Sequence, residues 1–143
     1  MRVEQVGIDV VLPLRAAVLR AGLPVDTARY EQDLLATTVH LAAVDRTGAV
    51  VGCASWSPEP YQGRPGWRLR GMATAESTRG QGVGAQLLAA GLDLGRARGA
   101  EVAWCNARTA ALGFYRRYGF VAVGDEFDVE HAGPHYRMWR GLA

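Results

Sequence analysis

The sequence predicts an α/β fold, a mixed and predominantly antiparallel sheet of six to seven strands with helices on both faces, in a single domain over residues 1–143. Three observations support this prediction. The length of 143 residues is typical of one domain with one core. Hydrophobic residues make up 49% of the chain, enough for a packed interior. The expected element order, β-α-α-β-β-β-α-β-α-β-β, places a run of strands before a β-α-β-α unit, which favours a mixed sheet covered by helices.

The first half of the chain predicts four strands and two helices. Residues 2–8 alternate weakly between apolar and polar and predict a first strand. A helix is expected from near Leu12 to Arg20, with Asp9 as its cap, because Pro13 fits only in a first turn. The remaining elements are a short helix over 26–36 with Tyr30, Leu34 and Leu35 facing inward, strands over 38–44, 49–56 and 67–74, a hairpin turn at 45–48 and a loop over 57–66.

The second half predicts the main helix. Apolar residues recur at helical spacing over 82–98, and Gly99 follows as a helix end. The elements expected after it are a buried strand over 101–105, a helix over 109–118 closed by Gly119, and two last strands over 120–123 and 136–139.

Composition argues against several classes of function. The net charge is +2, and all 16 basic residues are scattered arginines, which does not indicate a nucleic-acid partner. Cys53 and Cys105 fall in apolar strand patterns, so they predict buried thiols and no metal site. The N-terminus lacks a signal-peptide pattern and no apolar run is long enough to span a membrane. A cytoplasmic protein without a membrane partner is expected.

The most informative stretch is residues 77–88, where Gly80, Gly82 and Gly84 alternate between a predicted strand and the main helix. Glycines let a ligand approach the backbone closely. The start of a helix has unpaired N–H groups and partial positive charge. Together these features predict an anion site, most often for phosphate; the alternative is a tight turn without a ligand.

Three phosphate-binding patterns compete for this stretch. A P-loop requires a lysine, and the chain contains none. The dinucleotide pattern G-x-G-x-x-G/A is met by Gly80, Gly82 and Ala85, but the acid that should hold a ribose, Glu101, lies before the next strand and not at its far end. A nicotinamide-dependent oxidoreductase is therefore disfavoured. The third pattern, R/Q-x-x-G-x-G/A, is met by Arg79, Gly82 and Gly84.

With this third pattern the chain resembles the GNAT superfamily of acyl-CoA-dependent N-acyltransferases. Residues 71–74 resemble the end of that family's fourth strand. Asn106 and the segment 110–120, which ends F-Y-x-x-x-G-F, resemble its second signature. The two signatures cover about residues 68–122 in the expected order. The resemblance implies that the fourth and fifth strands splay apart and that the pantetheine arm of the cofactor enters between them.

The resemblance also implies roles for individual residues. Acetyl-CoA is the implied cofactor and a primary amine of a small molecule or polypeptide the implied acceptor. Tyr115 matches the tyrosine that protonates the leaving sulfur; a phenol with a pKa near 10 suits a donor. A main-chain N–H near Met72 is expected to stabilise the oxyanion. The implied cofactor-binding residues are Met72, Ala73, Thr74, Arg79, Gly80, Gln81, Gly82, Val83, Gly84, Ala85, Asn106 and Tyr115.

The general base does not follow from the resemblance, because the strand over 67–74 lacks the glutamate that many members carry. Candidates are His40, Glu126, Glu130, His131 and His135, with His135 the first choice and Glu126 also proposed as catalytic. The acidic segment 124–135 is expected to lie near the acceptor and to attract a cationic amine. Expected acceptor-binding residues are Arg15, Tyr30, Glu126 and His135.

Two functions remain open from the sequence. The first is an N-acetyltransferase with direct transfer from acetyl-CoA to an amine. The second is a non-catalytic acyl-CoA-binding sensor or interaction module on the same scaffold, which the missing glutamate favours and Tyr115 opposes. The oligomeric state stays open, and a homodimer is compatible with the sequence.

Overall fold

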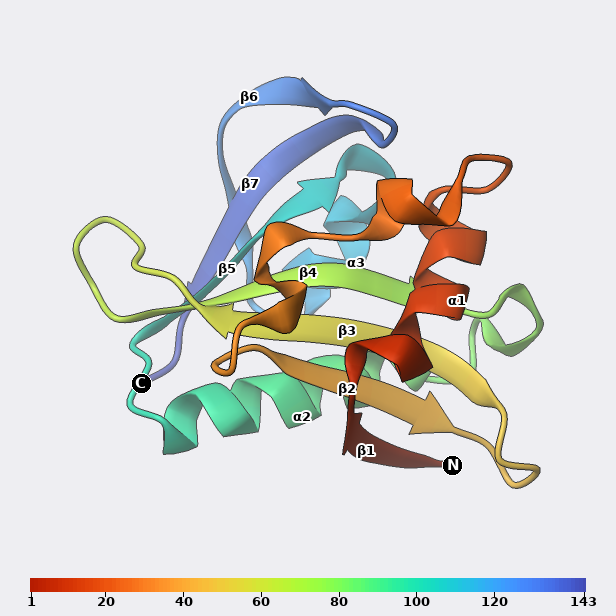
Figure 1. The fold of residues 1–143 in the computed structure, drawn as a ribbon. Coiled ribbons are helices and arrows are strands. Elements are labelled where there is room, and N and C mark those ends of the chain that lie inside the picture. Colours follow the sequence, from red (N-terminus) through yellow and green to blue (C-terminus); the bar gives the residue numbers. More distant parts are fainter.

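A computed structural model describes all residues 1–143 and contains one seven-stranded sheet, three α-helices and four short 3-10 turns (Figure 1). The sheet order is β1-β2-β3-β4-β5-β7-β6, so the mixed sheet expected from the sequence is confirmed. The strands are β1 (Arg2–Val6), β2 (Val39–Val44), β3 (Val50–Pro58), β4 (Gly66–Thr74), β5 (Val102–Arg108), β6 (Val121–Val129) and β7 (Gly133–Gly141).

Only β4 and β5 pair in parallel; all other neighbouring strands are antiparallel. A parallel pair needs a long crossover connection, and α2 (Val83–Ala97) provides it. The glycine-rich stretch lies between the end of β4 and the start of α2. It therefore belongs to the crossover connection of the parallel pair.

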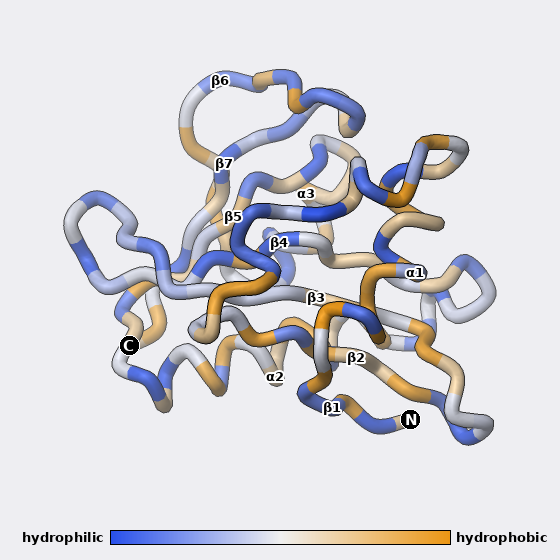
Figure 2. The backbone as a smooth tube through the Cα atoms, in the orientation of Figure 1, coloured by the Kyte–Doolittle hydropathy of each residue, from blue (hydrophilic) through white to orange (hydrophobic).

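Helices cover both faces of the sheet (Figure 1). The first helix, α1 (Ile8–Leu19), packs on one face of β3 and β4, and α2 and α3 (Leu112–Arg117) pack on the other. Along α2 the hydropathy alternates between apolar and polar with each turn (Figure 2), as expected for a helix with one buried side. None of the helices is long and apolar enough to cross a membrane.

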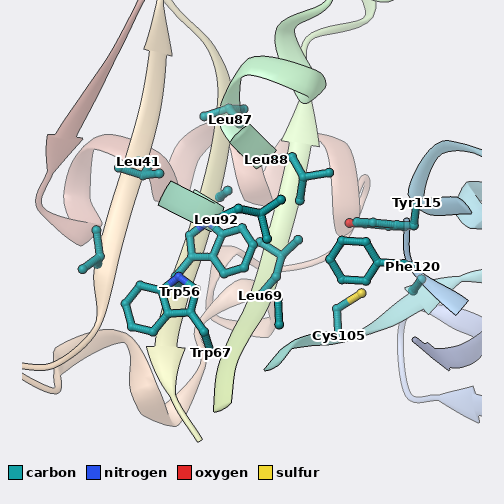
Figure 3. Packing of buried hydrophobic residues seen from close by; sticks show 14 of the residues in the cluster. Leu41, Trp56, Trp67, Leu69, Leu87, Leu88, Leu92, Cys105, Tyr115 and Phe120 are labelled. Atoms are coloured by element: carbon teal, nitrogen blue, oxygen red, sulfur yellow. The ribbon is translucent and has the colours of Figure 1, made fainter. Parts of the chain in front are cut away.

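The apolar core lies between the sheet and the α2–α3 layer (Figure 3). Trp56 and Trp67 are fully buried there, and their rings stack with centroids 6.1 Å apart. The indole N–H of Trp67 donates to the Gly91 carbonyl at 2.8 Å. A Cβ atom at Gly91 would lie 2.1 Å from the ring of Trp56, and one at Gly95 2.6 Å from that of Trp67. Small residues on α2 thus let the helix axis come close to the two indoles.

Side-chain alternation along β4 separates the two faces of the sheet. Trp67 and Leu69 belong to the apolar core, whereas Arg68 and Arg70 project to the other face and bond to Glu59 and Ser57. Successive side chains of a strand point to opposite faces. The face covered by α1 is therefore polar where β4 and β5 meet, and this is where a site with charged side chains can form.

The first helix begins earlier than the sequence predicted. It starts at Ile8 after Gly7, not near Leu12, and it contains Pro13. A proline there removes one helical hydrogen bond. Val11 is buried against the sheet and Leu12 against Ala28, so the packing of these turns outweighs the lost hydrogen bond.

The helix expected over 26–36 is replaced by two 3-10 turns, Val25–Ala28 and Glu31–Leu34. Leu34 and Leu35 were expected to face inward, but they are 84% and 54% exposed. Asp33 explains the difference, because its carboxylate turns inward to Arg15 and also accepts the backbone N–H of Tyr30. A tertiary ion pair therefore determines the path of this segment, which we call the strap (residues 25–35).

The last third of the chain contains more strand than expected. β5 continues to Arg108, so Asn106 lies within the strand and not after it. Half of the acidic segment 124–135, which was expected to be a connection, belongs to β6, and its last residues begin β7. The β6–β7 hairpin is hydrophilic toward its tip (Figure 2). The helix expected over 109–118 is a 3-10 turn at Thr109–Ala111 followed by α3.

Candidate active site

The glycine-rich loop has the backbone geometry of an anion site. Gly80 and Gly82 have positive φ angles of 84° and 80°, and Gly82 is the residue that precedes α2. A Cβ atom at either glycine would meet nothing within 4 Å, so the loop faces open space. The first N–H groups of α2 have no partner within the helix and carry its positive dipole. The loop can therefore bind a negatively charged group.

A cavity of about 490 Å³ lies against this loop. Arg79 and Arg117 are its only charged lining residues, one from the loop and one from the end of α3, so its electrostatic character is positive. The lining residues are Val18, Met72, Ala73, Thr74, Thr78, Arg79, Gly80, Gly82, Val83, Gly84, Ala85, Phe114, Arg117 and Tyr118. We call it the loop cavity.

The sheet opens beside the loop cavity. Pairing between β4 and β5 begins at Gly66 and ends at Leu69 opposite Cys105, although both strands continue. The end of β4, from Arg70 to Thr74, therefore has no strand partner on the β5 side. Main-chain groups along this edge remain available to a ligand.

A bulge in β4 lies at this opening. Ala73 pairs with Cys53 and Arg70 with Ser55, so Gly71 and Met72 together oppose one residue of β3. Gly71 has a φ of 66°, which favours glycine, and a Cβ atom there would lie 2.7 Å from Arg15 Nε. A bulge of this kind leaves one residue unpaired, so the regular hydrogen bonding of β4 with β3 is interrupted at this point.

A second cavity of about 310 Å³ adjoins the first. The two share Met72 and Phe114 in their linings, so they meet at the β4 bulge. The lining of the second cavity comes from the end of α1, the strap, β4, β5 and β7, and also from α3 on the opposite face of the sheet. Its lining residues are Leu19, Arg20, Tyr30, Arg68, Leu69, Arg70, Gly71, Met72, Asn106, Ala107, Arg108, Ala111, Phe114, Tyr115, Val129, Ala132 and His135. We call it the acceptor cavity, because Tyr30 and His135, two of the residues expected from the sequence to bind an acceptor, line it.

Tyr115 reaches the acceptor cavity from α3 and is 6% exposed. Its ring packs edge-on against Phe120 and Phe114, with Cys105 close by (Figure 3). Burial and, secondly, the neighbouring Cys105 raise the pKa of the phenol well above its usual value of 10.0. The phenol thus keeps its proton at neutral pH, as a proton donor must.

His135 lines the same cavity from β7. Its Nδ1 lies 2.8 Å from the Gly133 carbonyl oxygen, which can only accept, so Nδ1 carries a proton. The neutral ring then has its lone pair on Nε2, the atom that can accept a proton. Arg108 is the direct cross-strand partner of His135 and lies on the same face of the sheet.

Arg15 does not line either cavity. Its side chain is fully buried and its guanidinium donates to Asp33 at 2.8 Å, to Ser55 at 2.7 Å and to the Ala28 carbonyl at 3.0 Å. It also lies 4.3 Å from the ring centroid of Tyr30, which does line the acceptor cavity. Arg15 was expected to contact the acceptor, but its donors are directed into the protein, and only its neighbour Tyr30 lines this cavity.

Glu126 also lies outside the acceptor cavity. It is exposed on β6, and its carboxylate accepts the hydroxyl of Thr109 at 2.8 Å. The other acidic residues of the segment 124–135 are exposed as well, and none of them lines the cavity. The expected acidic lip is therefore not part of the acceptor cavity, because these side chains point to solvent from the hairpin.

The other residues expected to bind cofactor divide between the two cavities. Nine of the twelve line the loop cavity and share the edge of β4 or the loop: Met72, Ala73, Thr74, Arg79, Gly80, Gly82, Val83, Gly84 and Ala85. Asn106 and Tyr115 line the acceptor cavity, and Gln81 is exposed and lines neither. His40, an alternative base, is buried between Ser55 and the Asp33 carbonyl.

Sequence reasoning missed three of the four arginines that line the acceptor cavity, namely Arg68, Arg70 and Arg108. The fourth is Arg20, at the end of α1, the region expected to form a wall of the acceptor pocket. The alternation Trp67-Arg68-Leu69-Arg70 was a usable signal, since it places two arginines on the face opposite the tryptophan core. For Arg108 no such signal existed, because β5 was expected to end at residue 105.

Comparison with known proteins identifies the family. The model of the acetyltransferase (GNAT) family matches residues 14–120. The chain belongs to this family. The matched region includes the glycine-rich loop, the β4 bulge and α3, so the resemblance read from the two signatures is confirmed.

Relatives and structural neighbours agree with this assignment. The chain is 30% identical to an uncharacterized N-acetyltransferase of Bacillus subtilis, YitI, over 99% of this chain and 97% of that protein. It is 32% identical to the L-methionine sulfoximine/L-methionine sulfone acetyltransferase of Pseudomonas aeruginosa, over 71% of this chain and 60% of that enzyme.

Two crystal structures illustrate the shared fold. Escherichia coli ElaA superimposes with a TM-score of 0.81 at 19% identity, covering 98% of this chain and 99% of ElaA. An aminoglycoside 6'-N-acetyltransferase in complex with coenzyme A gives a TM-score of 0.75 at 16% identity, covering 100% of this chain and 98% of that one.

Proposed function

We propose that this protein is an N-acetyltransferase that transfers the acetyl group of acetyl-CoA directly to a primary amine. The observation that carries the proposal is the meeting of the two cavities at the β4 bulge. One cavity has an anion-binding loop, and the other has a buried proton donor. Acetyl-CoA supplies the activated thioester, and the residues of this chain bind it, direct it and move the protons.

The loop cavity suits the donor substrate. The N-terminal N–H groups of α2, with Arg79 and Arg117, provide positive charge for a diphosphate. The free edge of β4 from Arg70 to Thr74 offers main-chain groups to the pantetheine arm. In this proposal, an N–H of the bulge near Met72 stabilises negative charge on the thioester oxygen. A structural neighbour of this fold was crystallised with coenzyme A, which supports the assignment.

The acceptor cavity provides the proton transfers. The amine nitrogen forms a bond to the thioester carbonyl carbon, and the carbon–sulfur bond then breaks. The proton lost by the nitrogen goes to Nε2 of His135, and the leaving sulfur receives the phenolic proton of Tyr115. The products are an N-acetyl amide and free coenzyme A. In this proposal Glu126 has no proton-transfer step, since it lies outside the cavity.

A small-molecule acceptor fits the cavity better than a folded polypeptide. Its volume of about 310 Å³ is at the lower end of the range for small-ligand sites. The relative from Pseudomonas aeruginosa acts on L-methionine sulfoximine, which is also a small molecule with a primary amine.

The competing function is a non-catalytic acyl-CoA-binding module. It is favoured by the absence of a carboxylate from β4, whose residues are Gly66–Thr74. Unlike the enzyme, such a module needs no proton transfer by Tyr115 or His135, since it only binds acyl-CoA. Substitution of Tyr115 therefore separates the two.

The test is Tyr115→Phe, with Tyr136→Phe as the matched control because Tyr136 lines neither cavity. Removing a general acid lowers kcat by about 100-fold or more, and the dissociation constant of acetyl-CoA, measured by calorimetry, should not change. Acetylation is followed by release of free thiol and by mass spectrometry of the amine. A Tyr115→Phe enzyme with full kcat would exclude Tyr115 as the acid. Failure of the unaltered protein to bind any acyl-CoA would refute the function as a whole.

A further inference from the structure

The charged residues that line the acceptor cavity are all positive. Four arginines, Arg20, Arg68, Arg70 and Arg108, line it, and no aspartate or glutamate does. A cavity built to receive an amine with no other charge would be expected to have the opposite sign, because an ammonium group is repelled by guanidinium groups. The excess of positive charge requires another explanation.

Two of these arginines share one carboxylate. Arg68 Nη1 lies 2.6 Å from Glu59 Oε2, and Arg70 Nη2 lies 3.0 Å from Glu59 Oε1. Both guanidinium groups are largely buried, with side chains 20% and 14% exposed. Burial and the neighbouring Arg68 lower the pKa of Arg70, as expected where two cations have a single counter-ion. Arg68 Nε is buried without any hydrogen-bond acceptor.

The other two arginines have no carboxylate at all. Arg108 Nη2 donates to the Leu19 carbonyl at 3.0 Å. Arg20 Nη1 donates to the same carbonyl at 3.0 Å and its Nε to the Thr27 carbonyl at 3.2 Å. These carbonyls orient the guanidinium groups without neutralising their charge. Such groups are pre-organised donors for an anion with two or more oxygen atoms.

We propose that the acceptor substrate is a small amine that also carries an anionic oxygen group, a carboxylate or a phosphate. In the acceptor cavity this group is bound by Arg108, which has no carboxylate partner, and by Arg70, which has to share Glu59 with Arg68. The proposal rests on the proposed function and specifies its substrate class. Arg108 is the cross-strand neighbour of His135, the proposed base. An anion held by Arg108 thus places the amine of the same small molecule within reach of His135 and of the β4 bulge.

The experiment compares matched pairs of acceptors at saturating acetyl-CoA. One set pairs the common L-amino acids with their α-carboxamides, and another pairs aminoethyl phosphate with ethanolamine. The pairs share the amine and differ in the anion. In the pair that is acetylated most efficiently, kcat/KM should be at least about 10-fold higher for the anionic member than for the uncharged one. A hydrogen bond to a charged group contributes at least the free energy that corresponds to this ratio. The two sets distinguish a carboxylate from a phosphate.

Two variants locate the anion site. Arg108→Gln and Arg70→Gln should each raise KM for the anionic acceptor by about 10-fold or more, with a smaller change in kcat and little effect on the uncharged member of the pair. Arg64→Gln is the control, because Arg64 lies on an exposed loop and lines neither cavity. Urea unfolding of each variant shows whether it is folded, and either arginine variant suffices if the other is not.

The outcomes separate this inference from the proposed function. Equal kcat/KM values for both members of every acetylated pair, or a preference for the uncharged member, would overturn the anionic acceptor and leave the acetyltransferase standing. If no amine is acetylated, the anion site is tested by calorimetry instead. The coenzyme A-loaded protein is titrated with the N-acetyl amino acids and with N-acetylaminoethyl phosphate. Binding that is lost in Arg108→Gln supports the anion site, and absence of binding overturns it.

Discussion

Replacing Gly91 by alanine tests whether the small residues of α2 determine where this helix lies. On helix propensity alone, alanine would stabilise the position by about 0.8–1.0 kcal/mol. In the structure, however, the new Cβ atom would lie 2.1 Å from Trp56 Cε2 and 2.2 Å from its Nε1. Carbon atoms in contact prefer a separation of about 3.5–4.0 Å, so the ring or the helix would have to move by more than about 1 Å.

Neither can move easily. Trp56 is fully buried and stacked on Trp67, whose indole N–H is bonded to the Gly91 carbonyl. Overpacking of a filled core costs typically about 1–3 kcal/mol and occasionally more. We therefore expect Gly91→Ala to lower the free energy of unfolding by about 2 kcal/mol, and the melting temperature by about 4–8 °C for a chain of this size.

The matched control is Gly113→Ala in α3. A Cβ atom there would meet nothing within 4 Å, so only the propensity effect remains, and the variant should be more stable by about 0.5–1 kcal/mol. Urea and thermal unfolding monitored by circular dichroism measure both. If Gly91→Ala were as stable as the parent or gained stability as Gly113→Ala does, the close approach of α2 to the indoles would be refuted.

Two further predictions concern buried polar groups. Arg15→Met should lower the free energy of unfolding, measured in urea, by about 3–5 kcal/mol, because Asp33 is left buried without its cation. The double variant Arg15→Met/Asp33→Leu should recover part of this loss. A loss below about 1 kcal/mol in the single variant would contradict the prediction. The raised pKa of Tyr115 gives stability that is complete below the ordinary phenol value of 10.0 and is lost as the pH rises above it. Stability of the parent should thus fall more steeply above about pH 10 than that of Tyr115→Phe, and equal slopes in urea unfolding at several pH values would argue against a buried phenol.

The parts of the site that depend on local backbone chemistry could be predicted from the sequence. Gly80 and Gly82 have the positive φ angles that a close-approach loop requires, and Val83 begins the expected helix. Local pattern was sufficient there because the strand, the loop and the helix are contiguous in the chain. The strap was mispredicted for the converse reason, since the inward turn of Asp33 depends on Arg15, which is 18 residues away in sequence.

The acceptor cavity could not be predicted in the same way. Its charged residues come from the end of α1, from β4 and from β5, and they face one another only once the sheet has formed. The acidic segment 124–135 is the partner that sequence adjacency predicts for an amine. Strand alternation and the β6–β7 hairpin instead direct those carboxylates to solvent and bring His135 inward.

The absence of a carboxylate base from β4 and the surplus of arginines have a common physical explanation within the proposed function. A carboxylate on β4 would pair with Arg68 or Arg70, as Glu59 does, and would cancel the charge that holds the anion of the substrate. An imidazole that acts as a base is neutral and leaves this charge intact. Nearby cations also favour the uncharged form of the bound amine, which is the nucleophile. The arginines that bind one end of the acceptor would thus help to activate the other, and a strong base becomes unnecessary.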